Sequence, residues 1–286
     1  MFIIANFKVT LHMLQWMNAI KLTGLLVLIL LQACTSQSRL LDIEAEKQGF
    51  NRLTVDGGGF QHVIFTKDGG KNNETLHVYL DGDGKPWIKH HLIAADPTPV
   101  NPLMFNLMAL DKAPSIYLGR PCYHGFAKTP PCAAELWTSA RYSLQVVSSM
   151  ERVLRDYIAG GGYQEVVLIG HSGGGTLAML LAERVRSIRA VVTIAGNLDI
   201  DAWTRYHGYT ALDASLNPAN RPALDADIHQ YHLIGKDDKN IPYQIVETVI
   251  QNQPSARVLM WDGFDHACCW ENIWQQFLNC LETYCS

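Results

Sequence analysis

Short runs of β-branched and other apolar residues alternate along this chain with longer segments whose apolar residues have helical spacing. The pattern predicts strands at 51–56, 60–67, 75–80, 115–118, 165–169, 188–195, 228–234 and 257–261, and helices at 102–110, 135–158, 176–185, 242–253 and 271–284. Short apolar strands separated by helices are typical of a mostly parallel sheet with helices on both faces. The fold class is therefore α/β, and the β-rich segment that opens the domain is expected to supply the antiparallel edge of the sheet.

The pattern weakens at residues 197–226, after the sixth predicted strand. This segment is rich in aromatic residues, Pro and Asn, and includes Trp203, Tyr206 and Tyr209. Substrate sites in open α/β sheets lie at the carboxyl ends of the strands, so a short insertion here can form a small lid over such a site. A plain surface loop is the alternative interpretation.

The first 33 residues have the features of a signal peptide. Lys21 precedes a run of about ten mostly apolar residues, which suits a signal-peptide core and is short for a membrane span. The run ends in Leu31-Gln32-Ala33-Cys34, which resembles the lipobox of bacterial lipoproteins. That resemblance implies cleavage before Cys34 and lipidation of Cys34. Since Thr35 stands where an Asp is associated with inner-membrane retention, it also implies an outer-membrane protein facing the periplasm.

Two alternatives stay open for this N-terminal region, namely a plain secretory signal and an N-terminal anchor helix. The stretch before Lys21 is long, so translation can start at Met13 or Met17. Residues 34–48 are polar and are expected to form a tether to a single main domain at 49–286.

Composition narrows the possible partners. The chain has 286 residues, of which 48% are hydrophobic and 17% charged, enough to bury a large core. The formal net charge is −4 and the Lys and Arg residues are scattered, so no nucleic-acid partner is expected. The oligomeric state stays open.

Cysteine usage agrees with export to an oxidising compartment. Setting Cys34 aside leaves six cysteines, for which 15 pairings are possible. We expect Cys122 to pair with Cys132 across a Pro-rich loop. We also expect two of the last four cysteines to tie the terminal helix to the segment at Cys268 and Cys269. A metal site is disfavoured because the cysteines show no Cys-x-x-Cys spacing.

The segment Gly170-His171-Ser172-Gly173-Gly174 carries the strongest functional signal. It follows a β-branched run and precedes a helical pattern, which predicts a sharp strand-to-helix turn with Ser172 at its apex. A nucleophile in such a turn has a strained backbone and tolerates only small neighbours. The helix amides beyond the turn point towards whatever Ser172 attacks.

A serine nucleophile needs a base, and the base needs an acid that holds its tautomer. Asp237 and Asp238 follow one predicted strand, and His266 follows the last one. All three therefore lie at carboxyl ends of strands, in the order Ser, Asp, His.

This arrangement resembles the α/β-hydrolase family from about residue 50 to the C-terminus. The resemblance implies the α/β-hydrolase fold, with Ser172 as nucleophile and His266 as base. It implies Asp238 as the acid, three residues after the strand-end Gly235 and before Ile241-Pro242. Asp237 is the first alternative, and Asp199 and Asp201 are minor ones, since some members carry the acid after the preceding strand.

An oxyanion hole needs two amide donors. We expect Gly173 to supply the first, and the amide of Asp83, in the turn after the third strand, to supply the second. Many family members have His-Gly where this chain has Asp81-Gly82. The Asp83 carboxylate is expected to point away, because a negative charge facing the oxyanion opposes its stabilisation.

The sequence thus predicts a serine hydrolase that cleaves a carboxylic ester or thioester of a small acyl substrate through an acyl-enzyme, with no metal or organic cofactor. A serine peptidase or aminopeptidase of the same fold is the first alternative, and its signature is an acid that pairs with a free α-amine, at Asp199, Asp201 or Asp83. A non-catalytic envelope lipoprotein that uses the fold for binding is the second.

Overall fold

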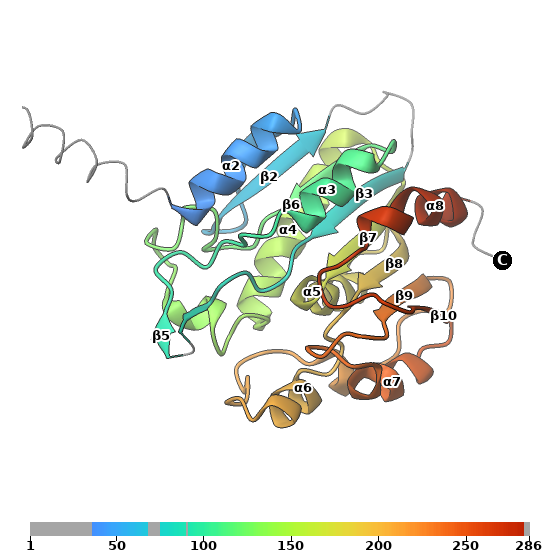
Figure 1. Ribbon diagram of the computed structural model, residues 1–286. Coiled ribbons are helices and arrows are strands. Elements are labelled where there is room, and N and C mark those ends of the chain that lie inside the picture. Colours follow the sequence, from blue (N-terminus) through green and yellow to red (C-terminus); the bar gives the residue numbers. More distant parts are fainter. Residues whose placement is uncertain (1–35, 68–74, 90, 283–286) are drawn as a thin grey trace, which may run out of the picture. The chain divides into compact units, whose positions relative to one another are not determined.

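An eight-stranded sheet forms the centre of this computed structural model, which describes residues 36–67, 75–89 and 91–282 (Figure 1). Its strands, in spatial order, are β1 (Asn51–Asp56), β2 (Gln61–Lys67), β6 (Ser115–Leu118), β3 (Thr75–Leu80), β7 (Glu165–His171), β8 (Ile188–Ile194), β9 (His229–Gly235) and β10 (Ala256–Trp261). β1 and β2 are antiparallel to their neighbours, and the other six strands run parallel. The predicted parallel sheet with an antiparallel edge is confirmed.

Helices cover both faces of this sheet and bury one apolar cluster on each. One layer consists of α2 (Gln37–Lys47), α3 (Leu103–Leu110) and α8 (Glu271–Glu282), and the other of α4 (Leu144–Gly161), α5 (Gly173–Ala182) and α7 (Tyr243–Gln251). Every residue of α5 is buried, as its position against the central strands requires. The sheet is thus shielded from water on both sides, as parallel sheets generally are.

The N-terminal boundary differs from the prediction. Contacts divide the chain into Met1–Ser36 and a compact unit Gln37–Ser286, and the predicted signal peptide and Cys34 lie outside the described residues. The segment expected to be a polar tether forms α2, whose Leu41 and Ala45 are buried in the core. Leu41 and Ala45 are four residues apart and so lie on the same face of the helix, which packs against the core.

The helix predicted at 135–158 also starts later than expected. A short 3₁₀ turn, η1 (Ala134–Trp137), is followed by an irregular stretch, and α4 begins only after Ser143. The Ser143 hydroxyl accepts a hydrogen bond from the amide of Val146, which caps the helix. The residues in between, among them Arg141 and Tyr142, are therefore not part of the helix.

Two insertions leave the carboxyl ends of strands. The segment 197–226 after β8 contains α6 (Ile200–His207) and the 3₁₀ turn η2 (Pro218–Asn220). The connection after β3 contains a small antiparallel hairpin of β4 (Trp87–Ile88) and β5 (Leu92–Ile93), which is separate from the main sheet. The hydropathy pattern did not predict this hairpin, because its strands are two residues long.

The predicted disulfide between Cys122 and Cys132 is confirmed, with the two Cα atoms 5.5 Å apart. The expected link from the terminal helix to Cys268 or Cys269 is wrong, because these two cysteines are bonded to each other. Each sulfur forms only one disulfide, so neither can also hold α8. Cys280, within α8, is itself disulfide-bonded.

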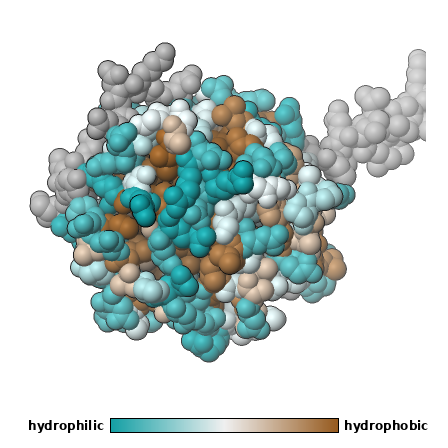
Figure 2. Space-filling view, turned by 180° about the vertical axis from the view of Figure 1, so that it is seen from behind, coloured by the Kyte–Doolittle hydropathy of each residue, from teal (hydrophilic) through white to brown (hydrophobic). Residues whose placement is uncertain are grey.

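The surface of the domain is mixed. On the face in Figure 2, small apolar patches are interspersed with polar residues. Among the described helices, none is both long and apolar enough to cross a membrane.

Candidate active site

Ser172 lies at the tip of the turn between β7 and α5. Its backbone has a φ of 53° and a ψ of −120°, a conformation that non-glycine residues rarely adopt. The turn is also crowded, because a Cβ at Gly170 would overlap the backbone of Gly174, and one at Gly174 would overlap the carbonyl oxygen of Leu80 in β3. Glycine at these positions lets the turn pack against the neighbouring strand.

A chain of hydrogen bonds joins three of the predicted site residues. The Ser172 hydroxyl lies 3.0 Å from Nε2 of His266, and Nδ1 of His266 lies 2.8 Å from Oδ2 of Asp238. They come from three loops that follow β7, β9 and β10. Parallel strands end at the same edge of the sheet, which is why residues 94 and 28 positions apart in sequence meet here.

The environment of Asp238 keeps it ionised. Burial by itself raises the pKa of this carboxyl, but the hydrogen bond and charge of His266 and the amides of Ile241 and Asn240 bring the pKa below its ordinary value. Those amides donate to Oδ1 at 2.9 and 2.8 Å, while Oδ2 faces the imidazole. Both oxygens are thus held, and the carboxylate is positioned to fix the tautomer of His266.

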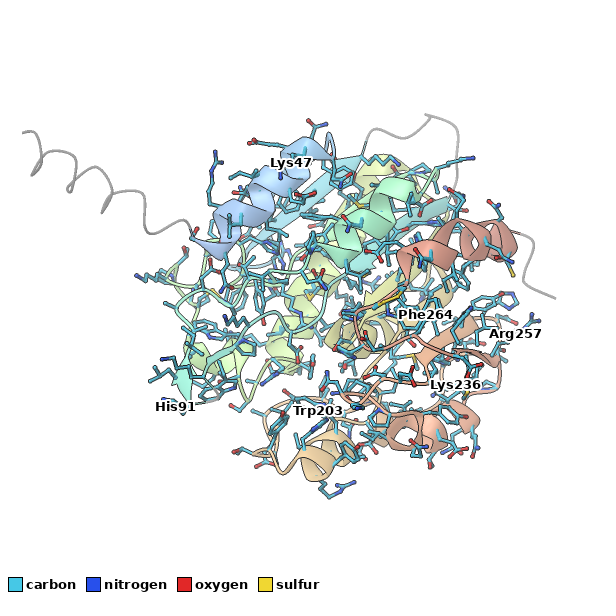
Figure 3. The ribbon with its side chains drawn as sticks, in the orientation of Figure 1. Lys47, His91, Trp203, Lys236, Arg257 and Phe264 are labelled. Carbon is cyan, nitrogen blue, oxygen red and sulfur yellow. A yellow bond between two sulfur atoms is a disulfide. The ribbon has the colours of Figure 1, made fainter. Side chains whose placement is uncertain are left out.

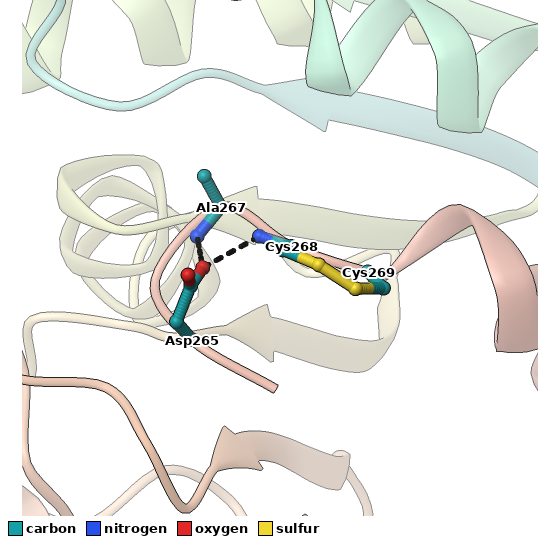
Figure 4. Close-up of a disulfide and its surroundings, with 4 residues drawn as sticks. All are labelled: Asp265, Ala267, Cys268 and Cys269. Atoms are coloured by element: carbon teal, nitrogen blue, oxygen red, sulfur yellow. Dashed lines mark hydrogen bonds between the residues drawn. A yellow bond between two sulfur atoms is a disulfide. The ribbon is translucent and has the colours of Figure 1, made fainter. Parts of the chain in front are cut away.

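The loop that carries His266 is braced on both sides. The Asp265 carboxylate accepts hydrogen bonds from the amides of Ala267 and Cys268, beside the Cys268–Cys269 disulfide (Figure 4). His171, in the position before the nucleophile, donates from Nε2 to the carbonyl oxygen of His266 at 2.8 Å. Burial lowers the pKa of His171 to about 4, so the ring is neutral at physiological pH. Its role was not predicted from the sequence.

None of the alternative acids contacts His266. Asp237 is exposed, and its amide donates to the carbonyl of Phe264. Asp199 caps α6 by accepting from the amides of Asp201 and Ala202. The Asp199 and Asp201 carboxylates also accept hydrogen bonds from the Asn217 side chain at 3.0 and 2.9 Å. These two acids hold the insertion together.

Asp83 follows β3 and lies against the turn at Ser172, since a Cβ at Gly173 would overlap its carboxylate. The carboxylate does not point away from the turn, contrary to the expectation from sequence. It is paired instead with Arg120 at 2.9 Å, Arg141 at 2.8 Å and the Tyr142 hydroxyl at 2.5 Å. We call these four residues the Asp83 cluster. Two guanidinium groups more than offset one negative charge, so Asp83 does not leave a bare anion beside the turn.

The charge state of the Asp83 cluster is firmly set. Burial opposes ionisation of Asp83, but the charges of Arg141 and Arg120 prevail and lower the pKa of its carboxyl to about 2. Arg120 also lies over two tyrosine rings, 5.7 Å from the centre of Tyr123 and 5.4 Å from that of Tyr142. By contrast, burial raises the pKa of the neighbouring Asp81 to about 7.

Asn240 is a further residue that sequence reasoning missed. Its side-chain Nδ2 lies 3.0 Å from Nε2 of His266, and its Oδ1 lies 3.3 Å from Nε1 of Trp203 in α6. Its place two residues after Asp238, in the same turn, was the available signal. Figure 3 labels Trp203 on the side of α6 nearer the sheet. The Asn240 side chain therefore links Trp203 of the insertion to His266, the predicted base.

No three His, Cys, Asp or Glu side chains are grouped to hold a metal ion in the part of the chain that the structure describes.

No protein-family model matches this sequence, and no curated protein does. Solved structures do resemble it. The esterase Pf2001 of Pyrococcus furiosus is 11% identical with a TM-score of 0.58, over 84% of this chain and 93% of that one. Alpha/beta hydrolase domain-containing protein 10 from mouse is 12% identical with a TM-score of 0.56, over 83% and 99%. An alpha-beta serine hydrolase homologue from Coxiella burnetii is 13% identical with a TM-score of 0.53, over 82% and 97%.

The chain has the α/β-hydrolase fold. The prediction of this fold from the sequence is confirmed. At such low identity the likeness concerns architecture, and within this α/β-hydrolase fold any activity has to be argued from the site itself.

The ion pairs of Asp83 predict a specific dependence of stability on pH. Its pKa is lowered in the folded state, from 3.8 to about 2, so its contribution is present above about pH 4 and is lost as the pH falls through 2. We expect Asp83→Asn to be less stable than the wild type at neutral pH. The difference in free energy of unfolding should shrink by roughly 2 kcal/mol between about pH 5 and about pH 2, measured by urea denaturation.

Asp262→Asn is the matched control, because Asp262 also pairs with a cation, Lys236, yet its side chain is 88% exposed. The difference in free energy of unfolding between Asp262→Asn and the wild type should stay near zero from about pH 5 to about pH 2. A difference for Asp83→Asn that stays constant with pH would contradict the pairing described here.

Proposed function

We propose that this protein is a serine hydrolase that cleaves a carboxylic ester or thioester through an acyl-enzyme on Ser172. The observation that carries the proposal is the continuous hydrogen-bonded chain from Ser172 through His266 to Asp238, with links of 3.0 and 2.8 Å. A nucleophile, a base and a buried acid in this order are what acyl transfer by a serine requires.

In the proposed mechanism, His266 takes the Ser172 proton at Nε2 while Oγ attacks the acyl carbonyl carbon. Asp238, ionised and hydrogen-bonded to Nδ1, stabilises the imidazolium that forms. The imidazolium then protonates the leaving alcohol or thiol as the bond to it breaks. A water molecule, deprotonated by His266, attacks the acyl-enzyme, releases the acid and restores Ser172.

The amides of Gly173 and Asp83 are the proposed oxyanion donors. Gly173 opens α5, where the helix dipole favours negative charge. Neutralisation of the Asp83 carboxylate by Arg120 and Arg141 supports this role, because an unpaired carboxylate in that position would oppose the oxyanion.

An ester or thioester is favoured over a peptide with a free amino terminus. The acids that could pair with an α-amine are otherwise engaged, since Asp83 is paired with two arginines, and Asp199 and Asp201 with Asn217. A purely binding role is disfavoured, because binding alone does not require a serine, an imidazole and a carboxylate in hydrogen-bonded sequence.

The test of catalysis is Ser172→Ala. We expect hydrolysis of p-nitrophenyl esters to fall by about 10³-fold or more, and labelling by a serine-directed fluorophosphonate to disappear. Ser255→Ala is the control, because this partly buried serine lies just before β10, at the amino ends of the parallel strands and away from the carboxyl ends where Ser172 lies. This variant should be labelled and should turn over substrate like the wild type. Equal labelling of wild type and Ser172→Ala would refute the nucleophile. Turnover of aminoacyl-nitroanilides without turnover of any ester, across a series of acyl-chain lengths, would favour the peptidase.

We further propose that the protein is a lipoprotein of the bacterial cell envelope, held in the outer membrane by lipid on Cys34 and facing the periplasm. The support is the lipobox-like segment at residues 31–34, together with a disulfide, Cys122–Cys132, in the folded domain.

Cys34→Ala should abolish lipidation and move the protein out of the outer-membrane fraction, as measured by mass spectrometry and density-gradient fractionation. Thr35→Ala, the adjacent position, is the control and should fractionate like the wild type. Unchanged mass and fractionation for Cys34→Ala would remove the lipoprotein proposal and leave the hydrolase proposal intact.

A further inference from the structure

The hairpin of β4 and β5 exposes large apolar side chains that have no place in either core cluster. Trp87, Ile88, Leu92 and Ile93 are 40, 39, 53 and 47% exposed. Figure 1 shows β5 at the margin of the domain, away from the central sheet, and Figure 3 labels His91 there. Four neighbouring exposed apolar residues on a two-stranded projection are more typical of a contact surface than of ordinary scattered exposure.

The charged side chains of this hairpin are all basic. Residues 84–95 contain no Asp or Glu, and Lys85, Lys89 and His91 are exposed. A tryptophan and aliphatic tips beside lysines suit the boundary between lipid headgroups and acyl chains, where apolar groups are buried and cations meet anionic phosphates. A protein partner could bind the exposed apolar residues without any need for basic residues beside them.

The start of the folded domain is fastened close to this hairpin. The amide of Ser38, in the first turn of α2, donates to Asp96 at 3.1 Å, and its hydroxyl donates to the same carboxylate. Asp96 follows β5 by three residues. Cys34 precedes Ser38 by four residues, which can span at most about 14 Å. A lipid on Cys34 would therefore enter the membrane near the hairpin.

We propose that the β4–β5 hairpin is a second membrane contact, which inserts its apolar tips into the headgroup boundary of an anionic bilayer. The proposal rests on the lipid anchor of the proposed function for its geometry. A lipid at the end of a short chain limits the distance of a domain from the bilayer without fixing its orientation, and a second contact fixes it. The hairpin follows Gly82 and Asp83, so the docked surface and Ser172 share one edge of the sheet.

The experiment uses the full-length protein in vesicles of phosphatidylcholine and phosphatidylglycerol whose acyl chains carry bromine, which quenches nearby tryptophan. The contribution of Trp87 is the difference in fluorescence between wild type and Trp87→Phe. We expect this contribution to be quenched in the anionic vesicles, and to be quenched less when phosphatidylglycerol is left out. Trp261→Phe is the control, because Trp261 is partly exposed on the edge strand β10, and β7, β8 and β9 lie between β10 and β3, the strand that the hairpin follows. Its contribution should not be quenched.

The lipid on Cys34 is checked separately, by mass. Unquenched Trp87 in lipidated protein overturns the hairpin contact and leaves the anchor standing. If instead the protein carries no lipid, the lipoprotein proposal fails, and quenching of Trp87 still decides whether the hairpin contacts the bilayer. A third outcome is that Trp87 is not quenched and that the protein self-associates in a way that Leu92→Ser abolishes. This outcome would show that the hairpin binds a second copy of this chain, and it would overturn the proposal.

A different observation, the orientation of the Asn240 amide, carries a second inference. An indole N–H only donates hydrogen bonds, so the Asn240 atom that faces Nε1 of Trp203, at 3.3 Å, is the oxygen. The amide NH₂ must then face Nε2 of His266, at 3.0 Å. His207, also in α6, donates to the Asn240 carbonyl at 2.8 Å and holds the backbone. The insertion thus determines which end of the amide the imidazole meets.

We infer that Asn240, oriented by Trp203, is a positioning residue that keeps Nε2 of His266 an acceptor. This inference rests on the proposed function. An N–H directed at Nε2 disfavours a proton on that atom and so favours the neutral imidazole. Nε2 has one lone pair, which this N–H shares with the Ser172 hydroxyl, so the amide has to yield when Nε2 takes the Ser172 proton. The charged and titratable groups around this ring are Asp238 at Nδ1, His171 with its ring centre 4.9 Å away, and Asp265 on the same loop.

The test is the pH profile of kcat/KM and of fluorophosphonate labelling. Asn240→Ala removes the donor, so the acid limb of both profiles should move to higher pH by about half a unit to one unit. Trp203→Phe keeps a ring but frees the amide to turn its oxygen towards the imidazole, and should move the limb the same way. The double variant should match Asn240→Ala alone, since Trp203 acts through Asn240. Tyr206→Phe, an exposed position on α6, is the control and should not move the limb.

An acid limb unchanged by Asn240→Ala, even with lower kcat/KM, would overturn this inference and reduce Asn240 to a packing role. Absence of labelling in the wild type would instead refute Ser172 as nucleophile. In that case an NMR titration of the His266 ring in wild type and Asn240→Ala, which needs no turnover, still decides the role of Asn240.

Discussion

The strand-to-helix turn at Ser172 is the constraint on which the rest of the structure depends. Its φ of 53° sends the chain back over the sheet, and its backbone touches the strands on both sides of β7. The Ser172 amide donates to Ile194 of β8 at 2.9 Å, and Gly174 lies directly beneath the carbonyl of Leu80 in β3. Three strands are thereby held in register at the point where the serine emerges, and the fully buried α5 keeps them there.

Two carboxylates near this turn show how environment divides the roles of one residue type. Asp238 has an imidazole and two backbone amides as partners, which leave it a single orienting contact with His266. Asp83 has two guanidinium groups and a phenol, which use both of its oxygens. Buried ion pairs seldom stabilise a fold strongly, because desolvation offsets their attraction. The Asp83 cluster is better understood as a means of holding a turn next to the nucleophile without leaving a bare charge there.

Both insertions start from the carboxyl ends of strands, but one contacts the site and the other exposes apolar side chains at the surface. The segment after β8 places Trp203 against Asn240 and so connects an aromatic surface to the imidazole. The hairpin after β3 presents Trp87 and its neighbours to the outside. A parallel sheet collects its connections at one edge, so additions to separate loops act on the same site without disturbing the core.

The sequence by itself determined the elements with strong local periodicity, the mostly parallel character of the sheet, and the three loops that carry Ser172, Asp238 and His266. These properties are local, since a strand, its end and the glycines beside a tight turn are all visible within about ten residues. The partners of Asp83 could not be predicted in this way, because Asp83 and Arg141 are 58 residues apart and meet only through the packing of the turn before α4. The contact of Asn240 with Trp203 likewise joins residues from two separate loops. The docking of α2 through Leu41 and Ala45, and the pairing of Cys268 with Cys269, were likewise decided by tertiary structure. Side-chain partnership depends on which surfaces the packed layers bring together, and no short window of sequence contains that information.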